Sequence, residues 1–392
     1  MALASGAENS RNRLRENESR FRRLLGYLDA DPENLNLIAD AASAAFDAGN
    51  LATVQSLLDR HRDLADLPLM LINLDGLVAL RSSRLGDAAT AFNTLIAVGV
   101  TDPSVRFNRA WVHALQGEHE QALALLDDDA VAVTPRAAAL KVQMLHHLGR
   151  IEDALAAGHG LAERFPGNED LLGALSVVAM DADDLPLASY YANQAGGSTD
   201  ALTTRGLVAL NEDRADDAMA LFDEALARHP DAARAWLGKG LGLIATGQVP
   251  QGNVALQRGA EIFGDHLGSW IAVGWTQFIA KDLKAARATF EKALALDENF
   301  AESHGGLAVL DIAEGNLDGG KRRSEIALRL DRQCFGGMLA RMLLHEARGN
   351  VVAAQRIWDR ALDMPAGADG KTLAQAMIGM GLNPGRGSGS SA

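Results

Sequence analysis

A repeat of about 34 residues constrains the fold of this chain more than any other feature of its sequence. An alanine, a large aromatic residue and a second alanine recur in every second unit, as Ala218, Phe222 and Ala225, then Ala286, Phe290 and Ala293, then Ala354, Trp358 and Ala361. Trp236 and Trp270 lie one period apart, and so do Gly240 and Gly274, which follow them. This register predicts five units without insertion, which start at 199, 233, 267, 301 and 335.

The same frame extends towards the N-terminus, where the units start at 35, 69, 103, 135 and 169. Each unit has the length of two antiparallel helices of three to four turns, here called helix A and helix B. Small residues such as Gly206 on helix A and Ala218 on helix B let the two backbones approach, while Phe222 fills the space beside the next unit. One pair of helices cannot bury its apolar face alone. The units are therefore predicted to stack into a solenoid over 35–368.

The repeated residues resemble the tetratricopeptide repeat family. The shared pattern is Trp-x-x-x-Gly, a turn glycine seven residues later, and then Ala-x-x-x-Phe-x-x-Ala-Leu. Gly247 and Gly349 occupy the turn, where a left-handed conformation ends helix A. The resemblance implies an all-α, right-handed superhelical solenoid of about ten helix-turn-helix repeats, with A helices lining its concave side. It also implies a role in binding proteins or peptides.

The two ends of the chain differ from the repeats. Residues 1–34 are predicted to form an N-terminal capping helix with an Arg-rich polar start, because Phe21, Leu24 and Leu28 follow helical spacing. Glutamates are interleaved with the arginines of this segment, which favours a solvated, salt-bridged helix over a lipid-binding one. Residues 369–392 are predicted to form a short closing helix and a disordered Gly/Ser-rich tail.

Composition and charge exclude several classes of protein. The net charge of −14 argues against nucleic-acid binding, which normally requires a basic surface. The sequence has no run of about 18 apolar residues, so we expect no integral membrane segment. Polar and charged residues fill positions 8–23, where a secretory signal needs an apolar stretch. We therefore expect a cytoplasmic protein, and the Ala- and Arg-rich composition favours a bacterial one.

The sequence contains no pattern that indicates catalysis or metal binding. His146 and His147 are adjacent on a helix and point about 100° apart, so they do not form a metal clamp. The aspartate run 127–129 lacks the spacing of a calcium loop and is expected to be a solvated loop. The single cysteine, Cys334, has no histidine neighbour and is expected to be a buried structural thiol. We predict a protein that is not an enzyme and uses no cofactor.

The resemblance places the second, fifth, ninth and twelfth residues of each unit on the concave side. In the C-terminal units these positions are largely apolar, and no cationic cluster accompanies them. The predicted partner-binding groove consists of Leu237, Leu241, Ile271, Trp275, Phe278, Val309, Ile312, Leu339 and Leu343. Large exposed apolar patches usually mark interaction sites, and Trp275 is the expected anchor. Two alternatives stay open: a narrow groove closed by packing between A helices, and a groove covered by the chain itself or by self-association.

These features favour a non-catalytic scaffold or adaptor whose groove binds a peptide or an amphipathic helix of a partner protein. The first alternative is an assembly or chaperone component of a bacterial secretion, pilus or envelope-polysaccharide machine. The second alternative is a repeat-only partner of a separately encoded transferase. A transferase domain within this chain is disfavoured, because only the short segment 369–392 follows the last repeat.

Overall fold

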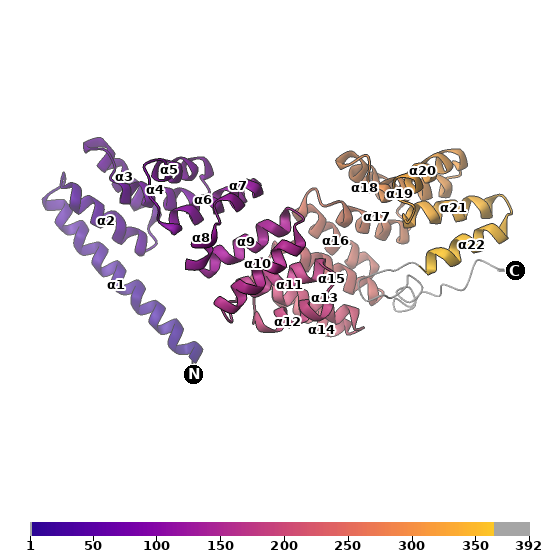
Figure 1. Ribbon diagram of the computed structural model, residues 1–392, viewed down its shortest axis with the longest axis horizontal. Helices are drawn as coiled ribbons and strands as arrows, with labels where there is room; N and C mark the ends of the chain where they lie inside the picture. Colours follow the sequence, from indigo (N-terminus) through magenta and orange to yellow (C-terminus); the bar gives the residue numbers. More distant parts are fainter. Residues whose placement is uncertain (1, 364–392) are drawn as a thin grey trace. The chain divides into compact units, whose positions relative to one another are not determined.

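The computed structural model describes residues 2–363, with side chains from Arg15 onward. Within that range the chain forms 22 α-helices and no strand (Figure 1). The all-α repeat fold predicted from the sequence is confirmed. The closing helix and tail predicted for residues 369–392 lie outside the described range. The chain divides into two compact units between Arg164 and Phe165, here called the N-terminal unit and the C-terminal unit.

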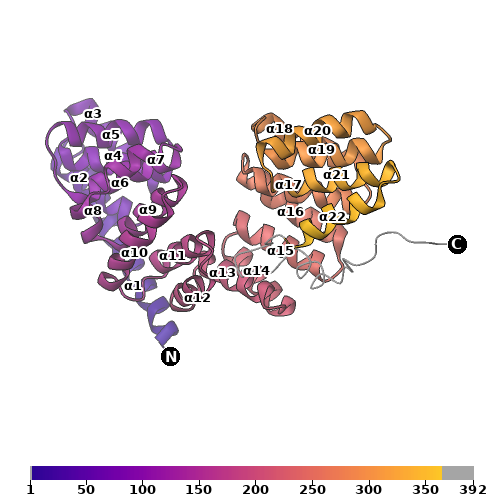
Figure 2. The same ribbon diagram turned by 45° about the vertical axis from the view of Figure 1, so that its right-hand side comes forward.

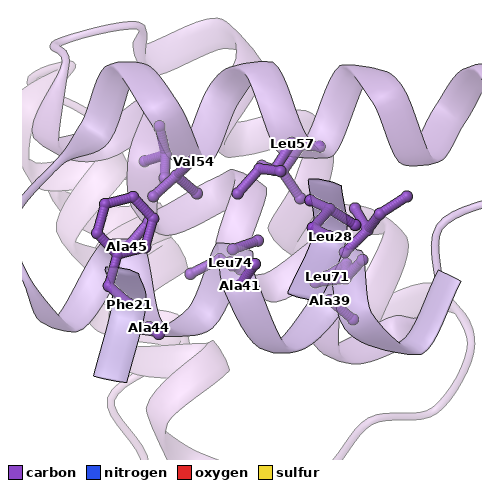
Figure 3. Packing of buried hydrophobic residues seen from close by; sticks show 14 residues of the cluster. Phe21, Leu28, Ala39, Ala41, Ala44, Ala45, Val54, Leu57, Leu71 and Leu74 are labelled. Atoms are coloured by element: carbon purple, nitrogen blue, oxygen red, sulfur yellow. The ribbon is translucent and has the colours of Figure 1, made fainter. Parts of the chain in front are cut away.

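The N-terminal unit contains ten helices. Their bounds are α1 Ala2–Ala30, α2 Leu35–Asp47, α3 Leu51–Leu64, α4 Leu69–Arg81, α5 Leu85–Ala97, α6 Pro103–Leu115, α7 His119–Ala124, α8 Asp128–Val133, α9 Pro135–His147 and α10 Ile151–Arg164. The A helices are α2, α4, α6 and α9. Phe21 and Leu28 of α1 are buried in a cluster with Ala41, Ala44 and Leu74, so α1 covers the apolar side of the first helix pairs (Figure 3).

The C-terminal unit contains six helix pairs in its described residues. Their bounds are α11 Glu169–Asp181, α12 Leu185–Gln194, α13 Thr199–Asn211, α14 Ala215–Arg228, α15 Ala233–Ala245, α16 Val249–Phe263, α17 Leu267–Ile279, α18 Leu283–Leu296, α19 Ala301–Ala313, α20 Leu317–Leu330, α21 Phe335–Ala347 and α22 Val351–Leu362. The odd-numbered helices are the A helices. Consecutive pairs stack directly on each other, as Figure 2 shows for α17–α18, α19–α20 and α21–α22.

A phenylalanine on helix B joins successive pairs in the C-terminal unit. The Phe222 ring of α14 is fully buried between Gly206 of its own pair and Gly238 of the next. A Cβ atom added to Gly206 or Gly238 would lie only 2.5 or 2.4 Å from the ring. Both glycines are therefore required by packing, because a methyl group would overlap the ring. The same arrangement recurs in α17–α19 with Gly274, Phe290 and Gly306.

A residue with positive φ follows every described A helix at the fifteenth position of its pair. Glycine occupies this position in six pairs. Ser83, Asp183, Asp213 and Lys281 occupy the other four, with φ values of 57–63°. The left-handed conformation costs a residue with a side chain roughly 1–2 kcal/mol. Packing between helices therefore imposes the turn even where the sequence lacks glycine.

Helix B is interrupted in the pair that begins with α6. It consists of α7 and α8, and Asp127 lies between them. The Asp127 carboxylate accepts a hydrogen bond from the backbone N–H of Ala130 at 2.9 Å, and it pairs with Arg106 of α6. A side chain that caps a backbone N–H in this way starts a new helix. The aspartate run at 127–129, expected to be a solvated loop, is instead the N-terminus of α8.

Gly238→Ala tests the contact between the Phe222 ring and the glycines. We expect the free energy of unfolding to fall by about 1–3 kcal/mol, because the new methyl group overlaps the ring. Gly160→Ala in α10 is the control, since nothing lies within 4 Å of its added Cβ. The control should gain up to about 1 kcal/mol from helix propensity. Urea unfolding followed by circular dichroism measures both, and equal stability of the two variants would contradict the packing argument.

Candidate functional site

Three rows of mainly apolar residues follow one face of the C-terminal unit. They are the fifth, ninth and twelfth residues of the A helices, and their spacings of four and three place them on the same side of each helix. We call this surface the groove face. The predicted residues lie on α15 (Leu237, Leu241), α17 (Ile271, Trp275, Phe278), α19 (Val309, Ile312) and α21 (Leu339, Leu343).

Two of the nine predicted groove residues belong to the core. Val309 is fully buried, and only 8% of the surface of Ile271 is exposed to solvent. Val309 is buried in a cluster with Ala340 of α21. Helices α19 and α21 approach closely, because a Cβ atom on Gly305 would lie 2.7 Å from the backbone nitrogen of Gly337. Ile271 is buried in the cluster that contains Phe290. Val309 and Ile271 therefore support the groove face from below and are not available for contact with a partner.

The other predicted residues form a half-buried apolar surface. Five of them pack together against the buried side chains of Ala308, Val309 and Ala340; they are Trp275, Phe278, Ile312, Leu339 and Leu343. Leu237 is half-buried, and Leu241 is 46% exposed. Side chains from α17, α19 and α21 thus meet in one apolar cluster. Leu237 and Leu241 of α15 occupy the same positions on the preceding A helix.

Trp275 is held in place by three aromatic rings. Its ring lies 5.8 Å from that of Phe278, 5.4 Å from that of Phe290 and 5.7 Å from that of Phe335, in each case with an edge-to-face inclination. Such pairs stabilise each other by about 0.5–1.5 kcal/mol beyond the burial of apolar area. The half-buried Trp275 ring is therefore rigid, and its replacement by a charged residue would disturb the core as well as the groove face.

The structure adds residues that the sequence prediction missed. The ninth and twelfth positions of α11 and α13 are Val177, Met180, Leu207 and Leu210, all half-buried and apolar. They extend the groove face over all six A helices of the C-terminal unit. In the N-terminal unit, Trp111 of α6 occupies a ninth position and is 38% exposed. The same ninth and twelfth positions, counted in the units that start at 103, 169 and 199, point to these residues.

A half-buried carboxylate joins α19 to the start of α21. Glu302 accepts hydrogen bonds from the backbone N–H of Gly336 at 3.1 and 3.3 Å. Burial raises the pKa of Glu302, and the bond from Gly336 offsets part of the rise. Cys334 lies beside it, and burial together with the Glu302 charge raises the pKa of the thiol. The prediction of a buried Cys334 is confirmed, and the raised pKa disfavours the thiolate, which is the nucleophilic form.

The described residues offer no site for a metal ion. Between Arg15 and Asp363, where side chains are described, no group of three or more histidine, cysteine, aspartate or glutamate residues could hold one. The His147 ring of α9 stacks on His119 of α7, with ring centres 4.7 Å apart. Among the same residues, no helix has both the length and the apolarity needed to cross a bilayer.

The fold and the groove face define a helical repeat protein built from stacked A–B pairs. Sequence models described as tetratricopeptide repeat match residues 74–132, 203–260 and 267–300. The chain therefore contains tetratricopeptide repeats. No curated protein sequence matches it.

Solved structures with the same fold differ widely in sequence. The human IFIT1 dimer with m7Gppp-AAAA is 13% identical and has a TM-score of 0.51; the match covers 90% of this chain and 95% of that one. The Cut9–Hcn1 hetero-tetramer of the APC/C is 14% identical and also has a TM-score of 0.51; the match covers 89% of this chain and 84% of that one. Identities this low show the fold alone.

The raised pKa of Glu302 predicts a specific pH dependence of stability. Its pKa is higher in the folded chain than the ordinary value of 4.5, so ionisation opposes folding. Stability should therefore fall as pH rises from about 4.5 towards the folded pKa. Glu302→Gln keeps an oxygen that accepts the Gly336 bond but does not ionise. The free energy of unfolding of Glu302→Gln relative to wild type, measured with urea from pH 4 to 7, should rise with pH; a constant or falling difference would contradict the assignment.

Proposed function

We propose that the chain is a non-catalytic scaffold whose C-terminal unit binds an amphipathic helix of a partner protein. The observation that supports this proposal is the continuous groove face, in which half-buried apolar side chains come from consecutive A helices. Contiguous apolar side chains that face solvent often mark an interaction site. An amphipathic helix lays its own apolar side into such a groove.

The dimensions of the groove face indicate the length of the partner segment. Packed helix axes lie about 8–10 Å apart, so the three A helices α17, α19 and α21, which share one apolar cluster, span about 16–20 Å. A partner helix rises about 1.5 Å per residue, so about 11–13 residues would cross them. Because aromatic neighbours hold Trp275 rigid, little side-chain freedom is lost at the centre of this contact.

Two narrower roles are compatible with this scaffold. One is an assembly or chaperone component of a bacterial secretion, pilus or envelope-polysaccharide machine, and the other is a repeat-only partner of a separate transferase. The Ala- and Arg-rich composition supports a bacterial protein. The identity of the proteins that the groove face retains distinguishes the two roles.

Leu241→Glu tests the groove face directly. Leu241 is 46% exposed, so a carboxylate at this position reaches water in the free protein and should leave the fold intact. In a complex the same charge would be buried against the partner's apolar side. We expect the amount of partner co-purified from the native cell, quantified by mass spectrometry, to fall at least about tenfold.

Val254→Glu is the matched control for this experiment. Val254 is a 68% exposed apolar residue on the B helix α16. It receives the same charge outside the groove face, so the control should retain the wild-type yield of partner. Undiminished capture by folded Leu241→Glu, or an equal loss in both variants, would rule out the groove face as the binding site.

A further inference from the structure

Charged residues along one edge of the groove face specify its occupant more closely; the argument rests on the proposed binding function. The stretch from Glu169 to Glu224 contains twelve acidic residues and only two arginines. It forms α11 to α14, the first two helix pairs of the C-terminal unit. A large part of the net charge of −14 is therefore concentrated in the first two helix pairs of the C-terminal unit.

Two exposed carboxylates of this stretch lie directly beside apolar groove residues. Asp183 follows Met180 by three residues in the turn between α11 and α12, and Asp213 follows Leu210 by three residues in the turn between α13 and α14. Met180 and Leu210 are the twelfth residues of α11 and α13 and belong to the groove face. Both aspartates have positive φ, 61° and 59°, so the two turns present equivalent positions at the same edge.

The neighbouring acidic groups are already engaged within the chain. Asp181 pairs with Arg234 at 2.6 Å. Asp184 accepts the N–H of Leu187 and caps α12, and Glu212 pairs with Arg214. Within the described residues no ion pair is formed by Asp183 or Asp213, and both side chains are exposed to water.

The turn residues farther along the C-terminal unit are not acidic. The fifteenth position of the pair, where Asp183 and Asp213 lie, is occupied by Gly247 after α15, by Lys281 after α17 and by Gly315 after α19. Among the A helices of the C-terminal unit, this turn position is therefore acidic only after α11 and α13. The rows of the groove face are mainly apolar, with the exposed Glu346 at the twelfth position of α21. Charge complementarity opposes polyanions at this end and favours a cation.

We propose that the groove face takes a cationic amphipathic helix. The apolar side of this helix contacts the ninth and twelfth residues of the A helices. Its lysine or arginine residues lie over the turns that carry Asp183 and Asp213. The acidic edge at one end of the groove also fixes the direction in which the helix binds, with its most basic end over α11–α13.

Two designed peptides test the charge of the occupant. One is an 18-residue amphipathic helix of leucine and lysine, and the other has the same leucines with every lysine replaced by glutamate. Binding to the full chain is measured by fluorescence anisotropy at physiological salt. We expect the lysine peptide to bind at least about tenfold more tightly than the glutamate peptide, and the difference to shrink as salt is added.

Two charge-matched variants locate the contact. Asp183→Lys with Asp213→Lys should weaken binding of the lysine peptide at least about tenfold. Asp63→Lys with Glu152→Lys changes the net charge equally on exposed residues of the N-terminal unit and should leave binding near the wild-type value. An equal loss in both variants, or no loss in either, would overturn the proposal, because attraction would then come from total charge or from another surface.

Leu241→Glu separates failure of this proposal from failure of the scaffold function. If the lysine peptide does not bind, but Leu241→Glu still abolishes capture of native partners, the groove function stands and the cationic occupant is wrong. If Leu241→Glu leaves both peptide binding and native capture unchanged, the groove function itself is wrong and this proposal fails with it.

Discussion

The contact between a buried phenylalanine ring and two glycines sets the geometry of the C-terminal unit. Phe222 of one helix B touches Gly206 of its own helix A and Gly238 of the next, so one side chain fixes the distances among three helices. The hydrophobic effect favours burial of the ring, but the absence of Cβ atoms lets the helices come close enough to enclose it. Stability of such an array arises between neighbouring pairs, since no pair buries its apolar face alone.

The groove face is a consequence of this close packing. When the A helices lie near one another, their fifth, ninth and twelfth residues join into continuous rows instead of separate patches. The contact of Gly305 with Gly337 brings α21 over Val309 and buries it. Leu241 lies where two glycines flank it in α15 and stays nearly half exposed. The exposure of each groove residue therefore depends on which nearby positions of the A helices are glycine and which carry a larger side chain.

The sequence predicted the repeat fold because the periodicity of its small and aromatic residues is a local signal, repeated often enough to fix the register. It also placed Trp275 on the groove side of its helix. It did not predict that Val309 and Ile271 are buried, because their exposure depends on distances between helices that no single unit encodes. The break between α7 and α8 arises from one hydrogen bond of Asp127, and a count of apolar positions does not detect it. Likewise, Lys281 adopts the turn conformation of a glycine only because its neighbours impose it.

Photochemical crosslinking from the groove face tests the central claim most directly. A benzophenone amino acid is introduced at position 241 in one protein and at position 254 in another, and each is irradiated in the native cell. The account requires a covalent adduct with a partner helix from position 241 and none from position 254, and peptide mapping of the adduct should identify an amphipathic segment. Adducts of equal yield from both positions, or adducts from position 254 alone, would show that partners bind elsewhere.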